Sequence, residues 1–144
     1  MSIGKIGVVG AGTMGNGIAQ ACAVAGLDVV MMDIGEAQVQ RGLATIASSL
    51  DRLIKKDKLS AGQKDAAMAR IVAATSMPAL GDCDLVIEAA TENLQLKLDI
   101  FAKLDAAMRP DAILASNTSS ISITKLAAAT ARPGQVVGMH FFNP

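Results

Sequence analysis

The sequence predicts an α/β domain with a doubly wound, mainly parallel sheet. Short apolar runs alternate with longer stretches of helical periodicity throughout the 144 residues. The apolar runs are nearly continuous, which is typical of parallel strands buried on both faces. A glycine-rich turn, Gly10 to Gly15, follows the first run, at the place where a doubly wound sheet binds its ligand. These three observations favour the strand order 3-2-1-4-5-6.

The individual elements follow from the spacing of apolar residues. Strands are expected at residues 3–9, 29–32, 71–74, 84–89, 112–116 and 136–139. Helices are expected at residues 16–25, 36–58, 60–69, 94–108 and 123–129, with Ser60 and Gln63 as a capping box and Ser122 as a possible cap. Two helices are therefore expected between the second and third strands, where a single crossover helix would be enough. An insertion of this kind often serves binding.

Composition narrows the functional classes. Lysine plus arginine equals aspartate plus glutamate at 13 each, so nothing global points to nucleic acid or to an anionic membrane. The N-terminus has no leader pattern, and no apolar run approaches the roughly 20 residues of a membrane span. Cys22 and Cys83 form no CxxC pair, which favours free thiols and a cytoplasmic location. No metal site is expected.

The turn Gly10-Ala11-Gly12-Thr13-Met14-Gly15 lies between an expected strand and an expected helix. In a Rossmann-type fold such glycines allow a tight turn, a close approach of backbone to a pyrophosphate, and close packing of helix on strand. Asp33 ends the next apolar run, and its carboxylate could accept both hydroxyls of an adenosine ribose. It would repel a 2′-phosphate, so NAD is favoured over NADP. The alternative is a plain glycine turn with a solvated aspartate at a strand end.

Other polar residues follow later strands, at the same expected edge of the sheet. His140 comes just after the sixth strand, where an imidazole could abstract a proton from a hydroxyl, although a single histidine is more often structural. The polar run 116–120 follows the fifth strand and could equally be an ordinary loop. Glu92 and Lys97 follow the fourth strand, where Glu92 could simply favour a helix N-terminus.

A basic cluster lies near the end of the long helix. Ser49, Arg52 and Lys56 are spaced three and four residues apart, so they share one helical face. Such a face could contact the phosphates of a substrate tail. The alternative is a solvated helix end whose positive charges favour the helix dipole.

Four motifs together resemble the 3-hydroxyacyl-CoA dehydrogenase family, especially its bacterial short-chain members, the 3-hydroxybutyryl-CoA dehydrogenases. The motifs are the glycine turn, Asp84-Leu85-Val86-Ile87-Glu88-Ala89, Ala115-Ser116-Asn117-Thr118-Ser119-Ser120 and His140-Phe141-Phe142-Asn143-Pro144. The similarity covers the whole chain, and the last two motifs are specific. It implies NAD-dependent oxidation of a short-chain (3S)-3-hydroxyacyl-CoA to the 3-oxoacyl-CoA, and the reverse reduction.

The resemblance also implies a role for each matching residue. His140 matches the catalytic histidine, and Ser119 matches a serine that hydrogen-bonds the 3-oxygen of the substrate. Ser49 and Lys56 match positions that contact coenzyme A. The implied cofactor-binding positions are Gly10, Ala11, Gly12, Thr13, Met14, Gly15, Asp33, Glu92, Lys97, Asn117 and Asn143.

Members of the family continue past the position of Pro144 into a helical domain that forms a homodimer and closes the substrate cleft. We therefore expect residues 1–144 to be a truncated NAD-binding domain that binds cofactor with little or no turnover. The short-chain dehydrogenases need a Tyr-x-x-x-Lys pair and are excluded, because the chain has no tyrosine. Asp33 argues against the 3-hydroxyacid dehydrogenases, whose Asn-Arg pair selects NADP. A non-catalytic NAD-sensing module stays open as the alternative function.

Overall fold

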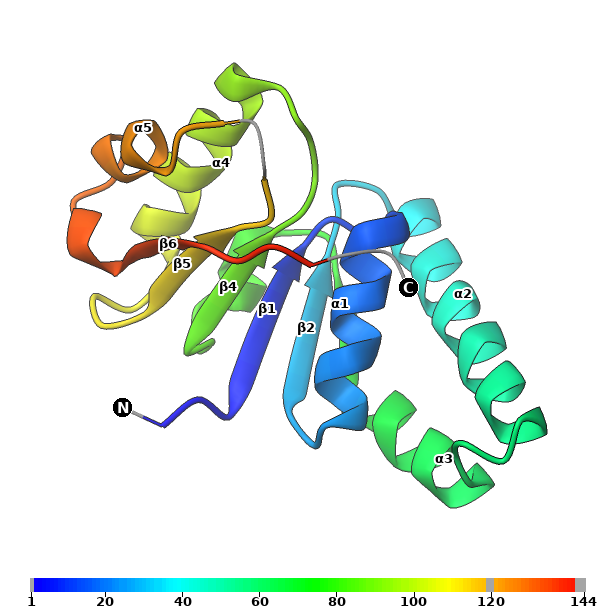
Figure 1. Ribbon diagram of the computed structural model, residues 1–144. Coiled ribbons are helices and arrows are strands. Elements are labelled where there is room, and N and C mark those ends of the chain that lie inside the picture. Colours follow the sequence, from blue (N-terminus) through cyan, green and yellow to red (C-terminus); the bar gives the residue numbers. More distant parts are fainter. Residues whose placement is uncertain (1, 119–120, 142–144) are drawn as a thin grey trace.

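The computed structural model of the chain describes residues 2–118 and 121–141. Within them lies one parallel sheet with the order β3-β2-β1-β4-β5-β6 (Figure 1). The prediction of a doubly wound sheet with this order is confirmed. The strands are β1 (Lys5–Val9), β2 (Asp28–Met32), β3 (Ile71–Ala74), β4 (Leu85–Glu88), β5 (Ile113–Ser116) and β6 (Val136–Gly138).

Helices cover both faces of the sheet, and each face has its own apolar core. On one face lie α1 (Thr13–Val24), α2 (Glu36–Lys55) and α3 (Ala61–Ala69), packed over a cluster that includes Ile18, Ile46 and Leu50. On the other lie α4 (Leu94–Ala107) and α5 (Ile123–Ala128), packed over a cluster that includes Phe101, Leu104 and Leu126 (Figure 1). The two-helix insertion predicted after the second strand is therefore α2 and α3.

Helix boundaries differ from the prediction by a few residues, for local reasons. The capping box of Ser60 and Gln63 is present, and the Ser122 side chain accepts from the Lys125 amide. Helix α2 ends at Lys55 because Asp57 takes a positive φ of 56°, which a helix cannot contain. Two short 3-10 helices, η1 (Met77–Leu80) and η2 (Pro133–Gln135), were not predicted. They are too short to show a helical period in sequence.

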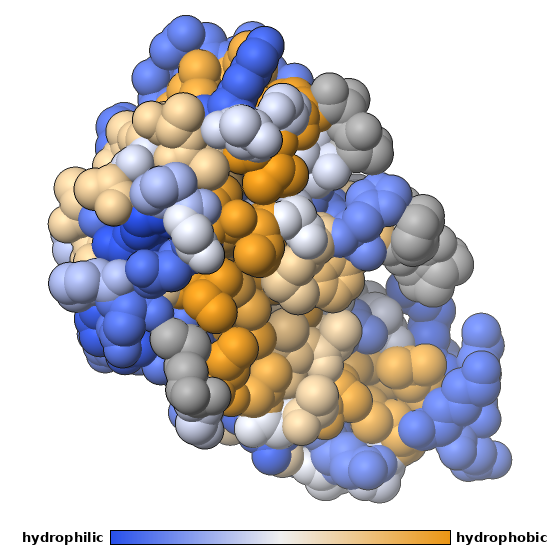
Figure 2. Space-filling view, turned by 60° about the vertical axis from the view of Figure 1, so that its left-hand side comes forward, coloured by the Kyte–Doolittle hydropathy of each residue, from blue (hydrophilic) through white to orange (hydrophobic). Residues whose placement is uncertain are grey.

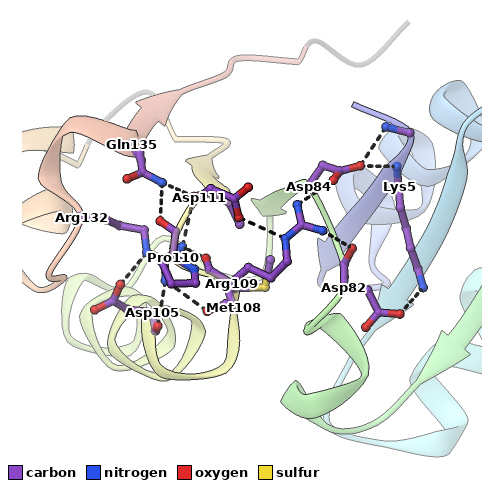
Figure 3. A network of polar contacts seen from close by, with 12 residues as sticks. Lys5, Asp82, Asp84, Asp105, Met108, Arg109, Pro110, Asp111, Arg132 and Gln135 are labelled. Atoms are coloured by element: carbon purple, nitrogen blue, oxygen red, sulfur yellow. Dashed lines mark hydrogen bonds and ion pairs between the residues drawn. The ribbon is translucent and has the colours of Figure 1, made fainter. Parts of the chain in front are cut away.

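Polar contacts join loops at the amino-terminal end of the sheet (Figure 3). The Asp84 carboxylate accepts from the backbone amides of Gly4 and Lys5 and from the Arg109 guanidinium at 2.7 Å. These donors, the Arg109 guanidinium first, lower the pKa of Asp84 to about 2. This network therefore ties β1, β4 and the end of α4 together, at the opposite end of the strands from the glycine turn.

Arg132 stabilises the carboxyl end of α4 (Figure 3). Its buried guanidinium donates to the Asp105 carboxylate at 2.6 Å and to the main-chain oxygens of Asp105, Met108, Arg109 and Ala112. Asp105 is in the last turn of α4 and Met108 is its C-cap, where a helix leaves carbonyl oxygens without partners of its own, while Arg109 and Ala112 lie just beyond. Arg132 therefore acts as a side-chain cap that joins α4 to the loop before β6.

Strand β6 forms one edge of the sheet and pairs only with β5. Figure 2 turns this side of the molecule forward and shows hydrophobic residues gathered in a band. Val137 on β6 is among the large apolar side chains that are exposed, at 40%. Among the described residues, no helix is both long enough and apolar enough to cross a membrane.

Candidate cofactor and active site

The residues singled out in the sequence gather at the carboxyl edge of the sheet. The glycine turn follows β1, Asp33 follows β2, and Glu92 follows β4. Asn117 directly follows β5, and His140 lies two residues beyond β6. Because all six strands are parallel, these segments emerge at one end of the sheet (Figure 1).

The first and last glycines of the turn are required by its geometry. Gly10 has a φ of +112°, and a Cβ there would lie 2.9 Å from the Ala89 carbonyl oxygen. A Cβ on Gly15 would lie 1.8 Å from the Gly10 carbonyl oxygen, so only glycine allows α1 to pack this close to β1. Around Gly12, in contrast, no atom lies within 4 Å of an added Cβ. The middle glycine therefore keeps open space at the start of α1.

Asp33 is joined directly to the glycine turn. One carboxylate oxygen accepts from the Ala11 amide at 2.9 Å, and the other accepts from the Ile34 amide at 2.7 Å. A cavity of about 290 Å³ lies beside them, lined by Ala11, Gly12, Thr13, Asn16, Asp33, Gln38, Arg41, Gly42 and Thr45. Each carboxylate oxygen keeps a further lone pair that can accept a hydroxyl.

These features fit an adenine dinucleotide. The space at Gly12 is open to a pyrophosphate, and the first turn of α1 lacks internal partners for its amides. Asp33 presents a carboxylate beside the cavity, where a ribose diol could bind. Met14 is half-buried at the start of α1 and lines a neighbouring groove.

A buried ion pair lies beneath this edge, at the end of β4. The Lys97 ammonium lies 2.5 Å from a Glu88 oxygen, and neither side chain has exposed surface. The same Glu88 oxygen accepts from the Ser116 hydroxyl at 2.9 Å, and the other accepts from the Ala90 amide at 2.8 Å. Lys97 is thus directed into the protein, and its predicted contact with the cofactor stays a prediction. Glu92 is exposed and accepts from the Thr118 hydroxyl at 3.0 Å.

His140 is exposed, while its neighbours Met139 and Phe141 are half-buried against the core on the α1 side. The Phe141 amide donates to the side-chain oxygen of Asn117 at 2.8 Å. The structure therefore joins two of the predicted site segments, one after β5 and one after β6. Ser119 and Asn143, expected to contact substrate oxygen and cofactor, lie outside the described residues.

A groove of about 480 Å³ runs between α1 and α2. Its lining joins Thr13 of the glycine turn, Ser49 and Arg52 of α2, and Phe141. Lys56, the other predicted contact with coenzyme A, is exposed just beyond α2 and does not line the groove. Arg52 shares a helical face with Ser49 and Lys56, and it is the basic residue that lines the groove.

The cysteines contribute no reactive group here. Both are free thiols, as the sequence predicted. Burial raises the pKa of Cys22, and it raises the pKa of Cys83 to about 11. Thiolate, the nucleophilic and metal-binding form, is therefore disfavoured at both. No group of three or more metal-ligating side chains occurs in residues 2–118 and 121–141.

Comparison with known families identifies the family to which this fold belongs. The family model of the 3-hydroxyacyl-CoA dehydrogenase NAD binding domain matches residues 5–144. The chain belongs to this family. The resemblance inferred from the sequence motifs is thus confirmed, and NAD is the cofactor of this domain.

Relatives agree with the assignment. A 3-hydroxybutyryl-CoA dehydrogenase from Bradyrhizobium diazoefficiens is 51% identical over 142 residues, which are 99% of this chain and 48% of that protein. One from Mycobacterium tuberculosis is 46% identical and is matched over 50% of its length. The chain thus spans about half the length of the curated relatives it matches.

Two solved structures have the same fold over the whole of this chain. The (S)-3-hydroxybutyryl-CoA dehydrogenase PaaH1 from Ralstonia eutropha superposes with a TM-score of 0.97 at 62% identity, covering 99% of this chain and 50% of that one. M. tuberculosis FadB2 superposes with a TM-score of 0.98 at 46% identity, covering 100% of this chain and 51% of that one.

Two features of this 3-hydroxyacyl-CoA dehydrogenase domain were not predicted. The sequence gives no sign that Glu88 pairs with Lys97, because Glu88 ends an apolar run and such a position usually reads as solvated. A spacing of nine residues across a loop has no fixed geometry. The bond from Phe141 to Asn117 spans 24 residues and depends on the neighbouring placement of β5 and β6.

Proposed function

We propose that this chain supplies the NAD-binding domain of a longer enzyme that oxidises a short-chain (3S)-3-hydroxyacyl-CoA to the 3-oxoacyl-CoA. 3-Hydroxybutyryl-CoA is the expected substrate, and the reverse reaction reduces acetoacetyl-CoA. The observation that supports this most strongly is the lining of the 480 Å³ groove. It brings together the glycine turn, the residue after His140, and the helix with Ser49 and Arg52.

The groove suits an acyl-CoA in its chemistry. Met14, Ile18, Leu53 and Phe141 give it apolar walls, which favour an acyl chain and the apolar part of its thioester arm. Arg52 adds a positive charge toward the end of α2, where Lys56 follows at i+4. Phosphates of coenzyme A are the anions that such a pair would bind. Ser49 lies one turn earlier and offers a hydroxyl.

His140 is proposed as the general base. Its exposed imidazole is at the carboxyl edge of the sheet, where it would accept the proton of the 3-hydroxyl. NAD, when bound, supplies a nicotinamide ring that accepts a hydride from C3. Ser119 would donate a hydrogen bond to the same substrate oxygen. In the reverse direction the protonated imidazole returns its proton to the 3-oxo group.

The catalytic role of His140 is tested by His140→Gln in the full-length enzyme. Removing a general base lowers kcat by about 10²- to 10⁴-fold, while the affinity for NADH stays near that of the wild type. Turnover of acetoacetyl-CoA by His140→Gln at the wild-type rate would overturn the role of His140 as the general base. Absence of turnover in the wild-type full-length protein, with NADH still bound, would instead favour a module that only senses NAD.

For residues 1–144 alone we propose NAD binding with little or no turnover, since the helical domain that closes the cleft is expected in the rest of the enzyme. The same helical domain is proposed to make the enzyme a homodimer. A cytoplasmic location is consistent with the two free thiols. Rapid reduction of acetoacetyl-CoA by this chain alone would contradict the first of these statements.

A further inference from the structure

Two hydrogen bonds hold the segment that contains His140. The Met139 amide donates to the Ser116 main-chain oxygen at 3.0 Å, and the Phe141 amide donates to the Asn117 side-chain oxygen at 2.8 Å. His140 is the residue between these two anchors. Met139 and Phe141 are also half-buried, whereas His140 is exposed. The backbone on both sides of His140 is therefore held by hydrogen bonds to the β5 segment, while His140 itself is exposed.

The second bond differs in kind from the first. The β5–β6 ladder ends with Ser116 opposite Gly138, and Met139 still donates to a main-chain oxygen of β5. In a parallel ladder alternate residues donate, so Phe141 would next use a main-chain oxygen two residues further along the β5 chain, at Thr118. The Asn117 side chain accepts instead. The Thr118 hydroxyl, in contrast, donates to Glu92 in the loop after β4.

Asn117 is itself firmly placed. Its main-chain amide donates to the Glu88 main-chain oxygen at 2.8 Å. The hydroxyl of the preceding residue, Ser116, donates to the buried Glu88 carboxylate. The Phe141 N–H requires the oxygen of the Asn117 amide to face it, which fixes the orientation of the amide group. Asn117 therefore links the buried end of β4 and β5 to the segment after β6.

We propose that Asn117 is a positioning residue for His140, acting through the Phe141 amide. This proposal rests on the proposed function, because it gives a reason for fixing His140 in place. A general base needs its nitrogen held close to the reacting hydroxyl, and small displacements cost much of the rate. The asparagine holds one side of the His140 backbone, and the β5 ladder holds the other.

Nuclear magnetic resonance tests this on the chain itself, because His140 is its only histidine and gives one set of imidazole signals. In Asn117→Leu the acceptor is lost. The Phe141 amide should exchange with solvent faster, by about tenfold, and the imidazole signal should move toward that of an unfolded chain. Asn117→Ala should behave in the same way and serves as a second variant if the leucine is not accommodated.

Two further variants separate positioning from general damage. Asn117→Asp keeps an oxygen for the Phe141 amide and should preserve its slow exchange and the imidazole signal. Thr118→Val removes the neighbouring hydroxyl bonds but not this one, and it should also leave both signals in place. An unchanged exchange rate at Phe141 and an unchanged imidazole signal in Asn117→Leu and Asn117→Ala would overturn the proposal.

Kinetics of the full-length enzyme then distinguish this inference from the proposed function. If both hold, Asn117→Leu lowers kcat and Asn117→Asp restores most of it. If His140→Gln retains full turnover, the catalytic role fails, while the magnetic resonance result still decides whether Asn117 positions the segment. A low kcat in Asn117→Leu with unperturbed Phe141 and His140 signals would contradict positioning.

Discussion

The Lys97 ammonium forms an ion pair with the Glu88 carboxylate at 2.5 Å, and both side chains are completely buried. Removing two charges from water is costly, and a buried pair is often no more stable than apolar residues of the same volume. Glu88 also accepts from Ser116 and from the Ala90 amide, so its carboxylate joins β5 and the loop after β4. We therefore attribute the buried pair to a structural role: it fixes the position of β5 and of the loop that follows β4.

Removing one member of this pair should lower the stability of the domain much more than removing both charges. Lys97→Met leaves the Glu88 carboxylate buried without its partner and should lower the free energy of unfolding by about 3–5 kcal/mol. The double variant Glu88→Gln with Lys97→Met should recover most of this loss, because no buried charge is left. Urea unfolding measures both. Lys103→Met, an exposed position on the same helix, is the control. A loss in Lys97→Met no greater than in Lys103→Met would refute the argument.

The glycines of the turn should separate folding from cofactor binding. Gly15→Ala places a methyl group against the Gly10 carbonyl and should lower stability by about 1–3 kcal/mol. Gly12→Ala meets no protein atom and should fold normally, yet its methyl group fills space meant for a pyrophosphate, so NADH affinity should fall by about tenfold. Gly62→Ala in α3 is the control, and it should lower neither the stability nor the NADH affinity by a comparable amount. Undiminished NADH binding by Gly12→Ala would contradict this use of the open space.

Asp84 should make stability depend on acid pH. Its pKa is lowered from 3.8 to about 2 by the Arg109 guanidinium and by the Gly4 and Lys5 amides. A carboxyl whose pKa is lower in the folded state contributes stability above its unfolded pKa and loses it as the pH falls through its folded pKa. The midpoint of urea unfolding should therefore exceed that of Asp84→Asn at neutral pH, and the difference should shrink between about pH 4 and pH 2. A difference that stays constant over this range would exclude the carboxylate as its source.

The fold was predictable because its signals are local and repeated. Apolar runs such as Val29 to Met32 and caps such as Ser60 need only a few neighbouring residues to be recognised. The parallel order of the strands then followed from the alternation with helices and from the glycine turn. The end of α2 was placed three residues too late, because the positive φ of Asp57 has no clear signal in its sequence.

The sequence predicted where the site residues lie in the fold, but it did not predict which side chains they contact. Strand ends indicated that Asp33, Asn117 and His140 would gather at one edge, and they do. The direction of each side chain depends on packing between distant elements. The burial of Lys97 against Glu88 was not predicted, and its expected contact with the cofactor stays a prediction. Phe141 had no expected role, yet its amide donates to the Asn117 side chain and the residue lines the groove.

The central claim is that the glycine turn and Asp33 form an NAD site, and a fluorescence titration of this chain with NADH and with NADPH tests it most directly. The chain has no tryptophan or tyrosine, so the protein contributes almost no background emission. The Asp33 carboxylate should accept the ribose hydroxyls of NADH and repel the 2′-phosphate of NADPH. We predict that NADH binds at least about tenfold more tightly than NADPH. Equal or tighter binding of NADPH would contradict the account.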